Sequence, residues 1–237
     1  MGKILGLIGG TGPQGTGLAI RFARAGKEND LEVIIGSRKQ DKAEKLASEC
    51  NERMGEDLII GFENPIAVEK SDYILLTIPF EYAEATVSGL KDRLTSDKIF
   101  VDVTVPLTME EYGEKKRKVP RLMPVEEGSA SELLRTIVPK DVPVVGAFKT
   151  ISAHALGEID EPLNRDVFVI GNEVPAKKEF MNVIDMLPDV RAVNVGDLWY
   201  ARVLEGMTAM VIRMNMLYKR KDLGYLMSLP HKGEKKW

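Results

Sequence analysis

The chain is predicted to be an α/β protein with a doubly wound, mainly parallel sheet and a small C-terminal α/β region that ends in a long buried helix. Two observations predict this class: short apolar runs rich in β-branched residues alternate with helical patterns, and a glycine-rich turn follows the first run. Apolar residues make up 44% of the 237 residues and charged residues 29%, which is typical of a globular protein with an ample core.

The predicted strands are near-continuous apolar runs, as expected where helices cover both faces of a parallel sheet. In chain order they are residues 3–8, 31–35, 58–62, 73–78, 98–105, 142–148, 166–170 and 191–195.

Helical patterns fill most of the intervals between these runs. The predicted helices are residues 14–25, 41–54, 80–90, 131–137, 176–187 and 198–221. The last of them carries Leu204, Met207, Val211 and Met214 at helical spacing and is apolar on more than one side. We expect this helix to be buried, in part by a second subunit, which predicts a homodimer or a larger homo-oligomer.

Residues 108–128 differ in composition from the rest of the chain. Glu110, Glu111 and Glu114 precede the basic run Lys115–Lys118, and prolines interrupt the segment. Because acidic residues flank the basic run, a solvated loop is favoured over a nucleic-acid patch. We expect a charged, mobile surface excursion, or a lid.

The overall charge narrows the choice of partners. Lys and Arg number 33 and Asp and Glu 36, for a net charge of −3, whereas a dedicated nucleic-acid binder needs a basic surplus. Apolar runs such as Tyr73–Phe80 are far shorter than the roughly 18 residues that span a bilayer. We expect neither a nucleic acid nor a membrane as a partner.

The cysteine and histidine content indicates the compartment and argues against a metal. Cys50 is the one cysteine of the chain, so it cannot form an internal disulfide, and a buried or idle thiol is expected. The first residues lack the pattern of a signal peptide, which favours a reducing cytoplasm. With His154 and His231 as the two histidines and no clustered cysteines, no metal site is expected.

A glycine pattern lies where a predicted strand meets a predicted helix. Gly10, Gly12 and Gly15 fit G-x-G-x-x-G in this setting. Gly10 permits the tight turn, Gly12 lets backbone amides approach a pyrophosphate, and Gly15 lets the helix pack closely, while the helix N-terminus favours the anion. This predicts a Rossmann-type dinucleotide-binding unit.

The end of the second predicted strand indicates which dinucleotide is bound. An NAD site has Asp or Glu there to bind the ribose 2′-hydroxyl. This chain has Ser37 and Arg38, with Lys42 in the next helix. A guanidinium, a hydroxyl and an ammonium suit a 2′-phosphate, so the sequence predicts NADP.

Two further strand ends are predicted to line the crevice for the nicotinamide. Residues Thr77–Phe80, which include Ile78, and Thr104–Pro106 place proline and apolar side chains at the carboxyl edge of the sheet. This favours hydride transfer with NADP(H). A general acid would have to be Lys149 or His154, for which a strand-end lysine and a surface histidine are the plainer interpretations.

Four motifs, taken in order, resemble a known family. They are Gly9–Gly12, Gly36–Arg38, Leu76–Glu81 and Ala147–Ile151. Together they resemble the NADPH-dependent oxidoreductases of coenzyme F420 from methanogens and related archaea. The resemblance covers nearly the whole chain, including the last helix with its Arg202 and Glu205. It implies reversible hydride transfer between NADP(H) and the 5-deazaflavin of F420.

The resemblance also implies roles for single residues. The pyrophosphate would be held by Thr11, Gly12, Pro13 and Gln14, and the 2′-phosphate by Ser37, Arg38 and Lys42. The nicotinamide half would be bordered by Phe80, Glu84, Val105 and Ala153. The deazaflavin would meet Lys149, Ile151 and the last helix.

These expectations divide the chain into an NADP-binding domain, residues 1–142, and a small C-terminal region, residues 143–237, that completes the deazaflavin site and forms the subunit interface. Because the rings of both cofactor substrates themselves give and accept the hydride, we expect no side chain to be essential as a proton donor. Two alternatives stay open: an NADP-dependent reductase of a small keto acid or imine that requires Lys149, and a non-catalytic NADP(H)-sensing protein.

Overall fold

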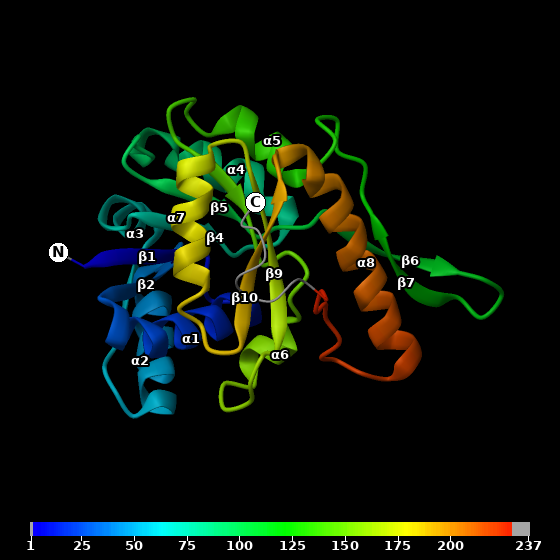
Figure 1. Ribbon diagram of the computed structural model, residues 1–237, viewed down its shortest axis with the longest axis horizontal. Helices are drawn as coiled ribbons and strands as arrows, with labels where there is room; N and C mark the ends of the chain where they lie inside the picture. Colours follow the sequence, from blue (N-terminus) through cyan, green and yellow to red (C-terminus); the bar gives the residue numbers. More distant parts are fainter. Residues whose placement is uncertain (1, 229–237) are drawn as a thin grey trace.

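The computed structural model describes residues 2–228, and in this part of the chain a twisted eight-stranded sheet carries helices on both faces (Figure 1). The sheet order is β10-β9-β8-β5-β4-β1-β2-β3. Its strands are β1 (Lys3–Ile8), β2 (Leu31–Ser37), β3 (Ile59–Glu63), β4 (Tyr73–Leu76), β5 (Ile99–Asp102), β8 (Val144–Gly146), β9 (Arg165–Gly171) and β10 (Val190–Gly196).

The helices connect these strands and cover the sheet. They are α1 (Pro13–Asn29), α2 (Gln40–Met54), α3 (Asn64–Lys70), α4 (Ala83–Leu90), α5 (Ala130–Ile137), α6 (Ala153–Gly157), α7 (Val174–Ile184) and α8 (Ala201–Tyr218). Side chains of α1, α2, α6 and α7 pack on one face of the sheet, and those of α3, α4, α5 and α8 pack on the other.

The strand order creates a crevice beside β1. Neighbouring strands are parallel except for β8 and β9, which pair antiparallel. The chain leaves β1 for β2 on one side and later returns to β4 on the other, so the connections diverge at the carboxyl end of β1. Ligands of doubly wound sheets bind at such a switch point. The predicted fold class is therefore confirmed.

Each predicted strand is present, but three are shorter than expected, and β8 keeps only Val144–Gly146 of the predicted residues 142–148. β4 ends at Leu76 and β5 at Asp102, so Thr77, Ile78 and the residues after Asp102 leave the sheet. The amide of Thr77 donates to the carbonyl of Ile8 at 3.0 Å, and its hydroxyl donates to the same oxygen at 3.1 Å. The apolar character that suggested longer strands belongs to residues at the carboxyl edge, which line the crevice instead.

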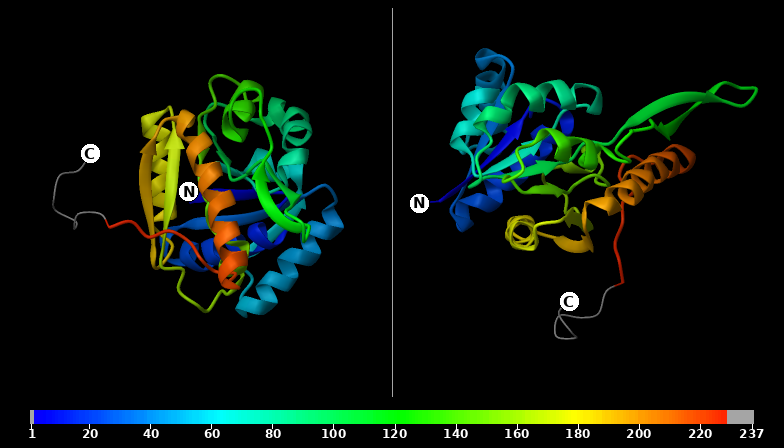
Figure 2. Two further views of the ribbon diagram at one scale, coloured as in Figure 1. Left: turned by 90° about the vertical axis from the view of Figure 1, so that its right-hand side faces the viewer. Right: turned by 90° about the horizontal axis from the view of Figure 1, so that it is seen from above.

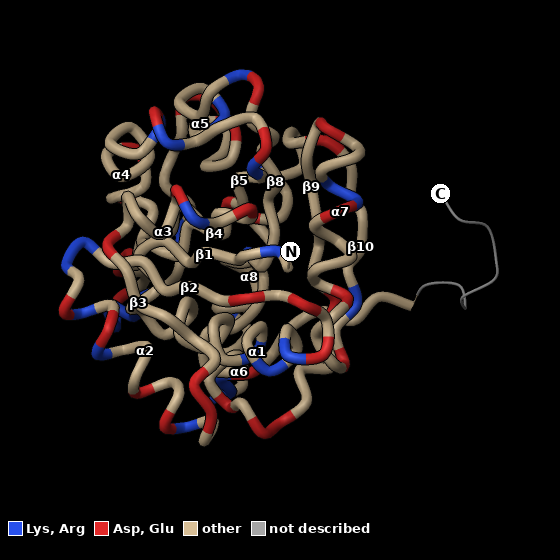
Figure 3. Tube along the Cα trace, turned by 90° about the vertical axis from the view of Figure 1, so that its left-hand side faces the viewer, with Lys and Arg blue, Asp and Glu red and all other residues tan. Residues whose placement is uncertain are grey.

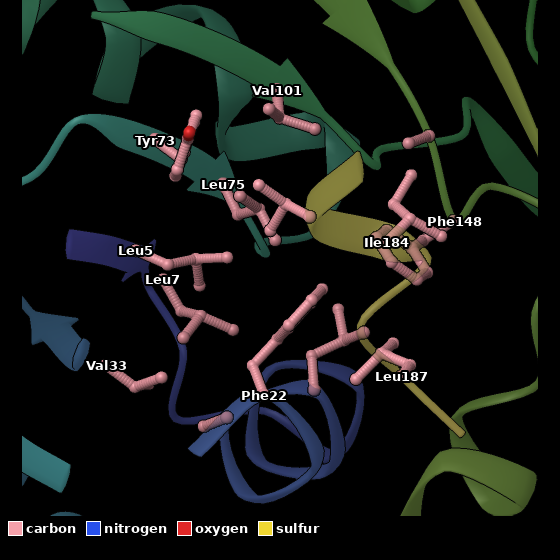
Figure 4. Close-up of a cluster of buried hydrophobic side chains, with 14 of the residues drawn as sticks. Leu5, Leu7, Phe22, Val33, Tyr73, Leu75, Val101, Phe148, Ile184 and Leu187 are labelled. Atoms are coloured by element: carbon pink, nitrogen blue, oxygen red, sulfur yellow. The ribbon is translucent and has the colours of Figure 1, made fainter. Parts of the chain in front are cut away.

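The core follows the period-two alternation of the strands. Leu5 and Leu7 of β1 point into the cluster that contains Phe22 of α1 and Ile184 of α7, as Figure 4 shows. Ile8, next in the chain to Leu7, belongs to the cluster on the opposite face. Cys50 is buried on the α2 side, and burial raises the pKa of its thiol to about 11, so the expected buried thiol is confirmed.

The expectation of a loop at residues 108–128 is wrong for most of the segment, which forms an antiparallel hairpin of β6 (Leu107–Tyr112) and β7 (Arg117–Leu122). Opposite charges face each other across the pair: Glu111 lies opposite Lys118, and Arg121 lies 3.9 Å from Glu110. Such cross-strand pairs stabilise a hairpin. In the sequence the same charges only form a charged run, which is typical of a solvated loop.

The hairpin lies along α8, and both project from the body of the molecule (Figure 2). Val119 and Pro120 of β7 are buried. The expected burial of α8 holds for one face, which contains Ala201, Leu204, Glu205, Thr208 and Val211. Val203, Met210, Met214 and Leu217 are exposed in this chain, so burial of the rest of the helix by a second subunit stays a prediction.

Charges of both signs are mixed on the surface. On the face that Figure 3 shows, Lys and Arg alternate with Asp and Glu along α2 and the neighbouring loops. Between residues 2 and 228, the helices include none that combines the length and the apolar character needed to cross a bilayer.

Candidate functional site

Two adjoining cavities lie at the carboxyl edge of the sheet. The larger, here called the central cavity, has a volume of about 600 Å³ and is lined by the glycine-rich loop, the ends of β4 and β5, the segment before α6, and α8. The smaller, the basic cavity, has a volume of about 330 Å³ and lies between that loop and the end of β2. Gly12, Thr77, Ile78 and Pro79 line both cavities, so the two form one continuous site.

The glycine-rich loop has the geometry of a phosphate cradle. A Cβ added at Gly12 would meet nothing within 4 Å, so this residue faces open space where a ligand can approach the backbone. At Gly15 an added Cβ would lie 2.6 Å from the backbone of Gly10, so Gly15 is needed for close packing of α1 on the loop. Gly12 is the N-cap of α1 and offers no side chain, which leaves the first helical N–H groups for an anion.

The basic cavity supplies cations where a dinucleotide bearing a 2′-phosphate would need them. The cavity is lined by Ser37, Arg38, Lys39 and Lys42 together with Thr11 and Asn64, and within residues 2–228 no Asp or Glu lines it. Arg38 and Lys42 are exposed. A guanidinium fork beside a hydroxyl and ammonium groups can bind a phosphate with charge-assisted hydrogen bonds, so the residues present fit NADP.

The walls of the central cavity are mostly apolar. Phe80 and Val105 line it from the ends of β4 and β5, and Ile151 and Ala153 line it from the start of α6. On the opposite wall α8 contributes Val211, Ile212 and Met216. Apolar walls hold flat rings and exclude water, so this cavity fits two stacked rings better than it fits a small polar substrate.

A buried ionic cluster forms the floor of the central cavity. Lys149 Nζ lies 2.7 Å from Asp102 Oδ2, 2.6 Å from the carbonyl of Thr104 and 3.3 Å from Glu205 Oε1. The side chains of Lys149, Asp102 and Glu205 are 0–2% exposed. Ser131 also donates to Asp102. The three N–H groups of the ammonium therefore have three acceptors, and the lysine holds the ends of β5 and α8 together.

Opposing effects act on the protonation of this cluster. Burial disfavours the ammonium of Lys149, but the carboxylates of Asp102 and Glu205 outweigh burial, so the pKa of Lys149 lies above its ordinary value. Burial raises the pKa of Glu205; the charge of Lys149 opposes this and that of Asp102 adds to it. Two carboxylates thus share one cation, and Glu205 is the member that holds a proton more readily than usual.

The structure brings most of the predicted site residues together. The central cavity is lined by Gly12, Pro13, Gln14, Ile78, Phe80, Val105, Lys149, Ile151 and Ala153. The basic cavity is lined by Thr11, Gly12, Ser37, Arg38, Lys42 and Ile78. Gly10 and Gly15 are buried behind the loop, where they shape it.

Three other residues that the sequence singled out lie elsewhere. Glu84 is exposed on α4 and lines neither cavity, so its assignment to the nicotinamide border is not supported by the geometry. His154 is exposed on α6 with Nδ1 3.7 Å from Glu158. Arg202 is at the surface and pairs with Glu132 at 2.8 Å.

Several residues of the site were missed. Asn64 accepts a hydrogen bond from the amide of Gly9 at 3.3 Å and so supports the loop, but it lies in α3, a helix that was not predicted. Arg220 and Lys221, beyond the end of α8, line the central cavity. The run Lys219–Lys221 that follows a long helix was the signal that could have found the latter two.

In residues 2–228 no three side chains of His, Cys, Asp or Glu are grouped so that they could hold a metal ion. His231, which was part of the argument against a metal, lies outside the described residues.

Known proteins resemble this chain over most of its length. A family model described as NADP oxidoreductase, coenzyme F420-dependent, matches residues 4–106. The F420-dependent NADP reductase of Methanocaldococcus jannaschii is 37% identical over 224 residues, which are 93% of this chain and 96% of that protein. The enzyme of the same name from Methanothermobacter thermautotrophicus is 36% identical over 223 residues, 93% of this chain and 92% of that protein. The chain belongs to the F420-dependent NADP reductase family.

Solved structures agree on the fold of this family member. The crystal structure of a protein described as an F420-dependent NADP-reductase from Arthrobacter superposes with a TM-score of 0.75 at 21% identity and covers 97% of this chain and 100% of that one. An imine reductase of Myxococcus stipitatus superposes with a TM-score of 0.59 at 14% identity over 92% of this chain and 63% of that one. At such identities the likeness establishes the Rossmann-type fold alone.

Proposed function

We propose that this protein transfers a hydride between NADP(H) and the deazaflavin coenzyme F420, in either direction. One observation carries the proposal: the basic cavity and the apolar central cavity share the wall formed by Gly12 and Thr77–Pro79. A dinucleotide whose 2′-phosphate lies in the basic cavity can extend past the glycine-rich loop and reach the central cavity, where space remains for a second ring. Membership of the F420-dependent NADP reductase family supports this assignment.

The protein contributes binding, orientation and exclusion of water. When both are bound, the nicotinamide and the deazaflavin supply the hydride chemistry themselves. The loop amides and the N-terminus of α1 bind the pyrophosphate, and Arg38 and Lys42 bind the 2′-phosphate. Phe80, Val105 and Ile151 form apolar walls that keep water from the reacting rings.

The ionic cluster supports a reaction without a side-chain proton donor. The ammonium of Lys149 uses its N–H groups on Asp102, the carbonyl of Thr104 and Glu205. A general acid must be able to reach the substrate, whereas this ammonium is held within the protein. This geometry disfavours a keto-acid or imine reductase that depends on Lys149.

Absorbance of the deazaflavin tests the proposed reaction. Purified protein is mixed with oxidised F420 and either NADPH or NADH, and the deazaflavin band is followed with time. We expect bleaching with NADPH and at least about tenfold slower bleaching with NADH, because the 2′-phosphate contacts are charge-assisted. Tight binding of NADPH without any bleaching would contradict the proposal and favour a reductase of a small substrate or an NADP(H) sensor.

The variant Arg38→Ala tests the cofactor assignment within the same assay. We expect the KM for NADPH to rise about tenfold or more, with kcat changed by less than about twofold. The contact is far from the reacting atoms, so its loss weakens the ground state and the transition state equally. Lys140→Ala, an exposed lysine at the other end of the sheet, is the matched control. An equal loss of kcat/KM with NADPH and with NADH would contradict the assignment of Arg38 to the 2′-phosphate.

The proposal also covers the roles of the two parts of the chain, the oligomeric state and the compartment. Residues 1–142 bind NADP(H), and the region from residue 143 onward completes the deazaflavin site. The protein forms a homodimer or a larger homo-oligomer through α8. The buried Cys50 suits the reducing cytoplasm of an archaeal cell of the kind in which these relatives are found.

A further inference from the structure

A short basic segment, Lys219–Lys221, follows α8 and is here called the basic turn. Lys219 ends the helix in the left-handed region with φ 53°, and its amide bonds to the carbonyl of Asn215. The amide of Arg220 donates to the same carbonyl at 2.8 Å. This C-cap reverses the chain, so Arg220 and Lys221 return toward the central cavity instead of continuing along the helix axis.

Hydrogen bonds fix the basic turn against the body of the molecule. The hydroxyl of Ser152, which precedes α6, donates to the carbonyl of Lys221. Arg165 of β9 donates to the carbonyl of Asp222, and the amide of Leu223 donates to Asn215 Oδ1 at 3.1 Å. These contacts use the backbone of the turn and do not occupy the charged ends of Arg220 and Lys221.

The charge of the central cavity comes from this turn. Among the residues that the structure describes, no Asp or Glu lines the cavity, and the cationic residues that line it are Lys149, Arg220 and Lys221. Lys149 is balanced by Asp102 and Glu205. Arg220 pairs with Asp222 at the surface, so among the described residues Lys221 contributes most to the positive potential at the mouth of the cavity, in a protein with a net charge of −3.

Only some of the hydrogen-bond donors of the Arg220 guanidinium are engaged within the protein. Its Nε and Nη2 donate to Asp222 at 3.0 and 2.9 Å. This pair is at the surface, where ion pairs contribute little to stability and exchange readily with other partners. Its Nη1 has no hydrogen-bond partner among the residues that the structure describes, and the same holds for the ammonium of Lys221.

The phosphates of NADP(H) do not need these cations. In the proposed function the glycine-rich loop and α1 bind the pyrophosphate, and the basic cavity offers Arg38, Lys39 and Lys42 to the 2′-phosphate. The basic turn is thus a second basic site, at the mouth of a cavity whose walls suit a flat apolar ring. A ligand that fits both has a flat ring followed by an anionic side chain.

We propose that the basic turn binds the anionic side chain of the deazaflavin, which carries a phosphodiester and then glutamate carboxylates. The inference rests on the proposed function, because it names a contact made by the second substrate of that reaction. Arg220 and Lys221 thereby select the complete coenzyme over the ring and ribityl chain alone. This attraction lies at the surface, so it weakens as salt is added.

Equilibrium binding tests whether the basic turn contacts the deazaflavin, and it does not depend on catalysis. The Kd of oxidised F420 and that of the 8-hydroxy-5-deazaflavin fragment lacking phosphate and glutamates are measured by fluorescence titration without NADP(H), at low and at high salt. We expect the protein to bind F420 about tenfold more tightly than the fragment at low salt, and this ratio to shrink at high salt.

Two variants remove the cations in different ways. In Lys221→Gln one positive charge is lost, and in the double variant Arg220→Gln with Asp222→Asn the guanidinium is lost without a change in net charge. We expect each to weaken F420 at least about threefold and to leave the fragment within about twofold, because one charge-assisted contact is removed. Lys140→Gln is the control, since it removes an exposed lysine outside the site.

The outcomes separate this inference from the proposed function. Equal weakening of F420 and the fragment, or no change in either Kd, would overturn the role of the turn. Weakened NADPH binding with an unchanged ratio would overturn it too, because the cations would then serve the dinucleotide. If the unaltered protein bound neither deazaflavin, the proposed function itself would fail. If a deazaflavin that keeps the phosphodiester but lacks the glutamates binds as F420 does, the result supports the turn and assigns its contact to the phosphodiester.

Discussion

Among single residues, Lys149 illustrates how position decides chemistry. A lysine at the end of a strand could serve as a general acid, and the sequence alone leaves that interpretation open. In the folded protein its ammonium is enclosed by Asp102 and Glu205. Removing one partner of a buried ion pair destabilises the folded state by about 3–5 kcal/mol, so each member of this cluster is needed for the stability of the fold. Its place below the central cavity links the stability of the fold to the shape of the site.

The cluster predicts a pH dependence that Glu205→Gln should reduce. The pKa of Glu205 is raised in the folded state from an ordinary value of 4.5, so the folded state binds its proton more tightly than the unfolded state does. The stabilisation is therefore full below pH 4.5 and is lost as the pH rises through the folded-state pKa. We expect the free energy of unfolding of the unaltered protein to fall, relative to that of the variant, as the pH rises from 4.5 through the raised folded-state pKa of Glu205.

Urea unfolding at several pH values measures this difference. Glutamine keeps the acceptor for the amide of Ala130 but cannot titrate. Glu84→Gln, which changes an exposed carboxyl outside both cavities, is the control and should show no relative change. A constant difference between the unaltered protein and Glu205→Gln over the whole range would contradict the assignment of the raised pKa to Glu205.

At the scale of elements, the β6–β7 hairpin supports the wall of the central cavity. Leu107 at its base lines the cavity, and β7 packs on α8 through the buried Val119 and Pro120. The base is closed by a hydrogen bond from the amide of Met123 to the carbonyl of Pro106 at 2.7 Å. The hairpin is thus a self-contained unit that contacts the central cavity and not the basic cavity.

Excision of residues 107–122, with two glycines joining Pro106 to Met123, tests this division. We expect the Kd of NADPH to stay within about twofold, and the Kd of F420 to rise about tenfold, since one wall of the central cavity is lost. Loss of the burial of Val119 and Pro120 should cost about 2 kcal/mol, which lowers the Tm by roughly 4–8 °C. Titrations with each ligand and a thermal melt provide the measurements, and equal loss of both ligands would contradict the division.

At the scale of the whole molecule, the projecting face of α8 exposes several large apolar side chains. Val203, Met210, Met214 and Leu217 are 37–56% exposed on it, and Met109 and Tyr112 of the hairpin are exposed as well. Monomeric proteins rarely expose contiguous apolar surface of this kind. Methionine side chains adapt readily to a partner surface. The proposed homo-oligomer would cover this face with a second copy of the chain.

The mass in solution tests that assembly. Light scattering on a sizing column should give at least twice the chain mass of 26.3 kDa. We expect the double variant Met210→Glu with Leu217→Glu to shift toward the monomer, because buried carboxylates at an apolar contact are strongly disfavoured. Ile60→Glu, on the edge strand β3, is a control that changes an exposed apolar residue elsewhere. A monomeric mass for the unaltered protein would contradict the proposed oligomer.

Much of the fold was accessible from local pattern. Apolar runs predicted every strand of the large sheet, and the glycines with Ser37 and Arg38 predicted the dinucleotide site, because those signals depend on neighbours in the chain. The short helices α3 and α6 were missed. Seven and five residues are too few to establish a helical period.

The amino-acid sequence by itself indicated the strands of the large sheet, the longer helices and the glycine-rich loop, since each is encoded in a few consecutive residues. Phosphate binding by this loop and the preference for NADP at Ser37 and Arg38 stay predictions. Only the tertiary structure decided where charges far apart in the chain would meet. It enclosed Lys149 with Asp102 and Glu205, which are 47 and 56 positions away, paired the charges of the hairpin, and turned Arg220 and Lys221 back to the cavity. The physical reason is that periodicity reports which face of an element is apolar, whereas the energy of a charge depends on partners that the fold alone brings within reach.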